Sequence, residues 1–114
     1  MIHELREYVA VDGQAEKLNR RFAEQTVTLF RENGMNVEAF WHENGDPAHI
    51  TYLLSFPDAN AQDRAWASFK SDARWLAVRA KTEADGPIVA SIHSRTLIAA
   101  PWWNSAHDME SGQR

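Results

Sequence analysis

The sequence contains no cysteine, and it has only five glycines in 114 residues. The lack of cysteine excludes disulfide frameworks, thiolate nucleophiles, thiolate zinc sites and iron–sulfur clusters. The glycines form neither a phosphate-binding loop nor a dinucleotide fingerprint, and no Gly-x-Ser-x-Gly motif occurs. Hydrolase, NTPase and Rossmann functions therefore lack support. Any chemistry in this chain has to use carboxylate, imidazole, phenol or guanidinium groups.

Long hydrophobic runs and runs of basic residues are also missing. No segment approaches the roughly 20 consecutive apolar residues of a transmembrane helix. The N-terminus carries Glu4 where a secretory signal would carry lysine or arginine. With 12 basic and 16 acidic residues the formal net charge is -4, which gives the chain no electrostatic reason to approach phosphate backbones. We expect a soluble, cytoplasmic protein with no membrane and no nucleic-acid partner.

What the sequence does contain is the composition of one folded domain, with 44% hydrophobic and 25% charged residues. Asp12 is the expected N-cap of a long first helix, and Gly34 follows its end where a left-handed residue is favoured. The spacing of apolar residues predicts seven elements. In chain order they are a strand over 2–10, a helix over 14–33, strands over 35–43 and 48–56, a helix over 58–69, a short helix over 72–84 and a strand over 88–97.

The two middle strands are predicted to form a hairpin around residues 44–47, which read Asn-Gly-Asp-Pro. A four-residue loop would place Trp41 opposite Ile50 on an apolar face that also includes Tyr52. The same register places His42 directly opposite His49 on the other face. Two opposed imidazoles can hold a metal ion, but exposed hairpin histidines need no ion, and we expect none.

The element order is that of an α+β, ferredoxin-like βαββαβ fold with a four-stranded antiparallel sheet. Right-handed crossovers give the strand order 4-1-3-2, which makes the first strand central. Helices would cover one face of the sheet, and the second face mixes polar and apolar side chains. We expect that face to pack on a second copy, so that a homodimer forms through sheet-to-sheet packing and closes a dimeric α+β barrel.

Two sets of residues are candidates for catalysis. Glu4, Arg6 and Tyr8 alternate along the first strand and so share one face, where Arg6 could clamp an anionic substrate and Tyr8 or Glu4 could move a proton. A buried ion pair that fixes the strand is the alternative. His93 lies on the last strand, where it could be a general base or a histidine of the contact between sheets.

The aromatic residues give a candidate ligand site. Trp41, Tyr52 and Trp66 are predicted at inward positions between the sheet and the helices, where they could line a pocket for a flat organic ligand or fill a core. Trp102 and Trp103 follow the last strand, where large rings are costly to leave in water. We expect them to dock across the dimer or to cap the mouth of the pocket.

Several separated segments resemble the NIPSNAP family. The opening Met-Ile-His-Glu-Leu-Arg-Glu-Tyr resembles the family's M-I-x-E-L-R-x-Y start, and 34–41 resembles its G-x-x-V-x-x-[FY]-W segment. Residues 50–56 resemble the hydrophobic third strand, and 72–75, Asp-Ala-Arg-Trp, resemble the D-P-E-W helix start. Residues 89–97 with Pro101 resemble the closing strand and its proline. The resemblance covers 1–101 as one ferredoxin-like domain, followed by a tail over 102–114 in which Trp-Trp-Asn replaces the usual ending.

The resemblance implies a protomer of a dimeric α+β barrel and does not imply a settled reaction. Neighbouring dimeric-barrel families include cofactor-free monooxygenases, small isomerases and stress-response proteins. We therefore expect a homodimeric barrel that binds a small organic molecule without a cofactor. The alternative is a cofactor-free monooxygenase or isomerase that acts on a small aromatic or polyketide-like substrate.

Overall fold

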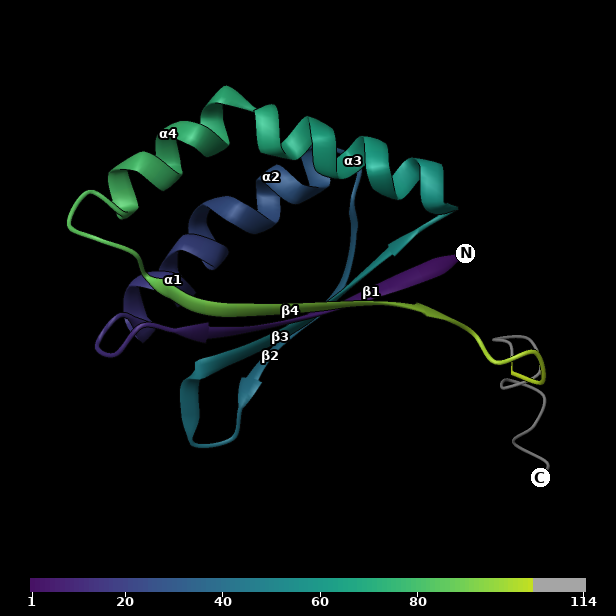
Figure 1. The fold of residues 1–114 in the computed structure, drawn as a ribbon, viewed down its shortest axis with the longest axis horizontal. Helices are drawn as coiled ribbons and strands as arrows, with labels where there is room; N and C mark the ends of the chain where they lie inside the picture. Colours follow the sequence, from purple (N-terminus) through teal and green to yellow (C-terminus); the bar gives the residue numbers. More distant parts are fainter. Residues whose placement is uncertain (104–114) are drawn as a thin grey trace.

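The computed structural model describes residues 1–103 and shows an α+β protein whose helices all lie on one face of a single antiparallel sheet (Figure 1). The strand order β2-β3-β1-β4 confirms the predicted ferredoxin-like topology with a central first strand. The elements are β1 (Ile2–Ala10), α1 (Ala15–Arg21), the π-helical turn η1 (Phe22–Thr26), α2 (Val27–Glu32), β2 (Asn36–Glu43), β3 (Asp46–Phe56), α3 (Ala59–Ser71), α4 (Ala73–Thr82) and β4 (Val89–Ile98).

The hydrophobic core lies between the inner face of the sheet and the helices, and aromatic rings make up much of it. Tyr52 is fully buried at its centre, where its ring stacks on Phe40 with a centroid distance of 4.4 Å and contacts Phe30 at 5.6 Å. Burial of such rings supplies the main stabilisation of a small domain without disulfides. The interior placement predicted for Tyr52 is confirmed, and Trp66 is partly buried against the core, which also contains Phe22, Phe30, Phe56 and Phe69.

The long first helix differs from its prediction at its start and in its middle. Asp12 does not cap it, because the helix begins at Ala15 and Gln14 occupies the cap position without a side-chain hydrogen bond. A π-helical turn, η1, separates α1 from α2, and the Thr26 hydroxyl donates to the carbonyl oxygen of Arg21 at 3.2 Å. Such turns insert one extra residue into a helix and often occur beside functional sites. Gly34 ends α2 with φ of 90°, as predicted.

The hairpin between β2 and β3 is tighter than predicted, and its register is different. Glu43 pairs with Asp46, so that only Asn44 and Gly45 form the turn, with φ of 80° at Gly45. The two-residue turns that match the twist of a hairpin, types I′ and II′, need a positive φ at their first residue. Asn44 is that residue and does not have a positive φ, so the turn is of neither type. The register accordingly shifts next to the turn, where Pro47 has no N–H to give to the ladder.

A second register shift, near Glu38, places the following residues of β2 on the faces opposite to those predicted. Between the two shifts Phe40 pairs with Tyr52, Trp41 with Thr51 and His42 with Ile50. A slip of one residue moves each side chain to the opposite face of a strand. Phe40 therefore packs inward, and the predicted placement of Trp41 on the inner face is wrong, since its side chain is 52% exposed. The predicted pairing of His42 with His49 is wrong for the same reason.

The last described residues continue beyond the sheet. β4 ends at Ile98, and the chain then extends away from the helices (Figure 1). Trp102 and Trp103 are exposed, with their rings edge to face at a centroid distance of 6.2 Å. Most of the predicted tail over 102–114 lies outside the described residues. Within the described part, no helix is long and apolar enough to cross a membrane.

Candidate functional site

A row of polar side chains crosses the inner face of the central strand β1. Glu4, Arg6 and Tyr8 point toward the helices, as the alternation of the strand predicts. Arg6 donates from Nη1 to Glu4 Oε2 at 2.9 Å and from Nη2 to the Tyr8 hydroxyl at 3.1 Å. Its Nε donates to the Tyr52 hydroxyl at 2.8 Å, and its guanidinium lies 4.4 Å from the centroid of the Trp66 ring. All three nitrogens of Arg6 therefore hold it in one orientation.

The Glu4 carboxylate is buried and fully hydrogen-bonded. Besides Arg6, three side chains from other elements donate to it: Gln62 at 2.9 Å, Trp66 Nε1 at 2.8 Å and Ser94 at 2.7 Å. Burial by itself raises the pKa of Glu4, but these hydrogen bonds to the charged form outweigh burial and lower the pKa below its usual value. Glu4 is therefore ionised at neutral pH and serves as the counterion that keeps Arg6 in place.

The two tyrosines of the sequence meet at this site. The Tyr52 hydroxyl donates to the Tyr8 hydroxyl at 3.0 Å, and burial, followed by the neighbouring Tyr8, raises the pKa of Tyr52 well above its usual value. Tyr8 thus accepts one hydrogen bond from Tyr52 and one from Arg6. A phenol has one proton to donate, and no acceptor for that proton is found among residues 1–103. Tyr8 is therefore arranged as a donor to something else.

A cavity of about 540 Å³ lies above this row, between the sheet and the helices. Arg6 and Tyr8 form part of its floor, and η1 contributes Phe22 and Thr26. Ile92 of the edge strand and Leu76 of α4 also line it and are 46% and 50% exposed, so the cavity opens to solvent between β4 and α4. Further aromatic walls come from Phe30, Trp66, Phe69 and Trp75.

The structure places the predicted site residues in three locations. Arg6, Tyr8 and Trp66 line the cavity, and Tyr52 lies directly beneath it, bonded to Tyr8. His93 pairs with Glu7 on the open face of the sheet, on the opposite side from the cavity. Trp41 also lies on that open face.

Sequence reasoning missed Arg21, which also lines the cavity. This arginine is only 6% exposed. Its Nη1 donates to Thr82 Oγ1 at 3.0 Å and to Glu83 Oε2 at 2.8 Å at the end of α4, and its guanidinium lies 5.0 Å from the centroid of Trp75. The available signal was its spacing, because Arg21 follows Leu18 by three residues and so falls at the margin of the apolar stripe.

The sequence model of the NIPSNAP family matches residues 3–104, nearly the whole chain. The chain belongs to the NIPSNAP family. The match agrees with the resemblance found in the separated sequence segments. No curated protein matches the sequence of this NIPSNAP protein.

Solved structures with the same fold include other members of the family. An uncharacterized NIPSNAP domain protein from Burkholderia xenovorans is 13% identical with a TM-score of 0.76, over 92% of this chain and 100% of that one. A NIPSNAP family protein from Agrobacterium tumefaciens is 14% identical with a TM-score of 0.77, over 91% and 97%. An antibiotic biosynthesis monooxygenase is 14% identical with a TM-score of 0.63, over 89% and 100%. At these identities the likeness shows the shared fold.

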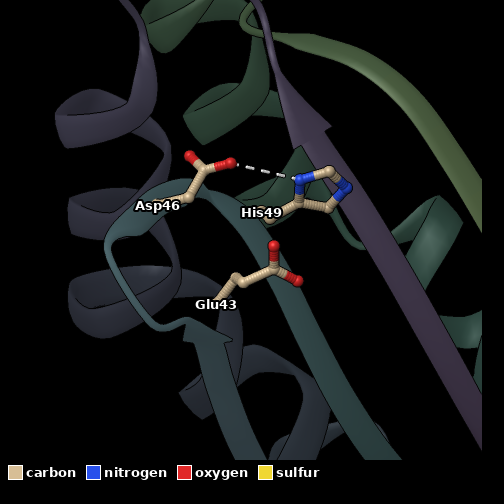
Figure 2. Close-up of side chains that lie close together, drawn as sticks. All are labelled: Glu43, Asp46 and His49. Carbon is tan, nitrogen blue, oxygen red and sulfur yellow. Dashed lines mark hydrogen bonds and ion pairs between the residues drawn. The ribbon is translucent and has the colours of Figure 1, made fainter.

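The hairpin tip of this NIPSNAP protein brings together a second group of polar side chains. Figure 2 shows Asp46 and His49 pointing toward each other, with Glu43 beside them. His49 Nδ1 lies 3.3 Å from Asp46 Oδ2, and one potential ligand atom from each of the three residues falls within 4.8 Å of the others. The tight turn and its register shift, which the sequence did not predict, create this cluster. Its side chains are open to water, which solvates them without a bound ion, so we assign no metal to it.

Proposed function

We propose that this NIPSNAP protein binds a small, flat organic molecule in the cavity between its sheet and its helices. The observation that carries the proposal is the cavity itself, with aromatic walls above the ordered Arg6 and Tyr8 pair. Ligand pockets typically measure roughly 300–1,000 Å³ and combine apolar walls with a few oriented polar groups. The present cavity, at about 540 Å³, matches that description.

The polar floor of the cavity suits a ligand that carries an oxygen acceptor. Tyr8 has its proton free to donate, and Arg6 holds the Tyr8 oxygen in place. Arg6 also keeps a second N–H on each of Nη1 and Nη2, because a guanidinium has five donors. An oxygen of the ligand that approaches the floor would meet these donors without any rearrangement of the protein, and preorganisation of this kind favours binding.

The test uses N-phenylnaphthylamine, a neutral aromatic probe whose fluorescence rises in apolar surroundings. We expect saturable binding to the wild-type protein and at least about tenfold weaker binding to Ala90→Trp, because an indole added to the cavity lining occupies the volume of the probe. Ala77→Trp on the exposed side of α4 is the matched control and should bind like wild type. Absence of saturable binding, or equal binding to Ala90→Trp, would contradict the proposal.

The open face of the sheet supports a homodimer formed through sheet-to-sheet packing. Strand alternation places a group of apolar side chains on this face, and two of them, Trp41 and Leu97, are 52% and 39% exposed in the single chain. Large exposed apolar side chains on a sheet face are typical of an interface, and a two-fold dimer would bury the same patch on both copies. The other members of the group are Leu5, Val9 and Leu53.

The second candidate function is cofactor-free catalysis, and the arrangement of Tyr8 favours it. A phenol that receives two hydrogen bonds and retains its own proton can donate to an oxygen on which negative charge develops. In this version Arg6 and Tyr8 act on the substrate, while Glu4 acts through Arg6. His93 would contribute only from the open face, at the dimer contact.

The two functions differ in turnover. A catalyst of oxygenation would consume dissolved oxygen in the presence of a small aromatic or polyketide-like substrate, and an isomerase would change the retention time of its substrate without a change in mass. A binding protein would return the same compound unaltered. Liquid chromatography with mass spectrometry on a panel of such compounds, with Tyr8→Phe as the control, separates the two.

A further inference from the structure

The charges around the cavity differ in sign from those of the chain as a whole. The chain carries a formal net charge of -4. The cavity nevertheless is lined by four basic residues, Arg6, Arg21, Lys70 and Arg79, and by one acidic residue, Glu83. Even when Glu4, the buried partner of Arg6, is counted with them, positive charge is in excess. Such a local field concentrates anions and excludes cations.

Arg21 differs from the other basic residues of the cavity because it is buried and only one of its three nitrogens donates a hydrogen bond within residues 1–103. Its Nη1 has two hydrogen atoms, which go to Thr82 and Glu83. No acceptor among the described residues is found for its Nε or Nη2. No buried side-chain nitrogen or oxygen in the described part of the chain lacks a hydrogen-bond partner, so these two groups must reach solvent. We take this solvent to be that of the cavity, because Arg21 is among the residues that line it.

The Nε and Nη2 groups form one edge of the planar guanidinium, and their two N–H bonds run parallel. This edge matches the two oxygens of a carboxylate. Glu83 holds Nη1, and the Trp75 ring packs against the guanidinium with its centroid 5.0 Å from Cζ, so the orientation of the edge is set before any ligand arrives. The π-helical turn begins at Phe22, directly after Arg21, and both residues line the cavity.

We infer that the cavity takes an aromatic or otherwise flat apolar carboxylate, whose carboxylate group is held by the Nε and Nη2 edge of Arg21. The ring system of the ligand then lies between Phe22, Trp66 and Trp75, with any second oxygen toward Tyr8. The inference rests on the proposed small-molecule function, and it adds the charge class of the ligand and the residue that selects it. Arg21 is a binding residue that is distinct from the Glu4 and Arg6 pair.

The test is displacement of N-phenylnaphthylamine by two compounds of the same shape, naphthoate and its neutral analogue naphthamide. We expect the wild-type protein to prefer naphthoate by about tenfold or more, as for a hydrogen bond to a charged group. In Arg21→Gln this preference should disappear, because the affinity for naphthoate falls more than the affinity for naphthamide. Arg20→Gln is the matched control, because Arg20 is the neighbouring arginine, is exposed and pairs with Glu16 on the surface. It should keep the preference.

The outcomes separate the inference from the function on which it rests. If the neutral probe does not bind to wild type, the proposed function fails, and the inference fails with it. If the probe binds but naphthoate is not preferred, or if Arg21→Gln keeps the preference, the inference alone is overturned. Should Arg21→Gln fail to fold because Glu83 loses its partner, the paired variant Arg21→Gln/Glu83→Gln removes both charges, and the same loss of preference is expected.

Discussion

The carboxylate of Glu4 lies 2.9 Å from Nη1 of Arg6, where Glu4 is buried and Arg6 forms part of the cavity floor. The two residues are neighbours on one face of the central strand. Their pairing gives Arg6 a fixed position from which it holds the hydroxyl groups of Tyr8 and Tyr52. The stability of the protein and the shape of the candidate site therefore depend on the same contact.

Removal of Glu4 is expected to destabilise the protein strongly. Glu4→Ala leaves the guanidinium of Arg6 buried without a counterion, and the loss of one partner of a buried pair costs about 3–5 kcal/mol. Urea unfolding followed by circular dichroism measures the change. Glu7→Ala is the matched control, because Glu7 lies on the open face of the same strand with 45% of its side chain exposed. Equal stability of the two variants would contradict the role of Glu4.

The contribution of Glu4 to the free energy of unfolding should also depend on pH. Because the pKa of Glu4 is lowered in the folded protein, its contribution is complete above the pKa of the unfolded chain, near 4.5, and is lost as pH falls through the folded value. We expect the difference in unfolding free energy between wild type and Glu4→Gln to shrink as the pH is taken from neutral to about 3. A difference that stays constant over this range would show that the charge of Glu4 is not involved.

Tyr52 should affect the stability of the protein at alkaline pH. Its pKa is raised in the folded protein, so its contribution is complete below the unfolded value near 10.0 and is lost as pH rises above that value. Stability of the wild type should fall between about pH 9 and pH 11, and the fall should be smaller in Tyr52→Phe. Urea unfolding at these values measures both. An equally steep fall in the variant would assign the loss to other groups.

The dimer proposed from the open face predicts a mass of twice the 13.0 kDa chain by light scattering. Trp41→Glu should convert it to a monomer, because a charge would replace the large exposed ring of this face. Leu76→Glu on α4 is the matched control, since Leu76 is 50% exposed but lies on the helical side, and it should remain dimeric. A wild-type monomer at micromolar concentration would contradict the proposed dimer.

Local patterns were sufficient to predict most of the fold. The alternation along β1 placed Glu4, Arg6 and Tyr8 on one face without any knowledge of their neighbours. The helices predicted from 58 and from 72 do start there, where the carboxylates of Asp58 and Asp72 cap α3 and α4. The topology followed from the element order. These features depend on residues close in sequence, and their physical causes act locally.

Features that depend on a shift of one residue could not be predicted. The placement of Trp41 required the register of β2, and an unpredicted bulge near Glu38 reversed it. A π-helical turn also interrupts the first helix directly after Arg21, and the apolar pattern does not reveal it. Neither irregularity changes the apolar pattern enough to be recognised, yet the bulge decides the face on which Trp41 lies.

The most direct test of ligand binding in the cavity is the response of the tryptophan indole N–H signals in a nitrogen-15 NMR titration with N-phenylnaphthylamine. Trp66 and Trp75 line the cavity, whereas Trp41 lies on the open face of the sheet. We expect saturable shifts of the Trp66 and Trp75 signals and an unchanged Trp41 signal. A shift confined to Trp41, or no saturable shift of Trp66 and Trp75, would contradict ligand binding in the cavity.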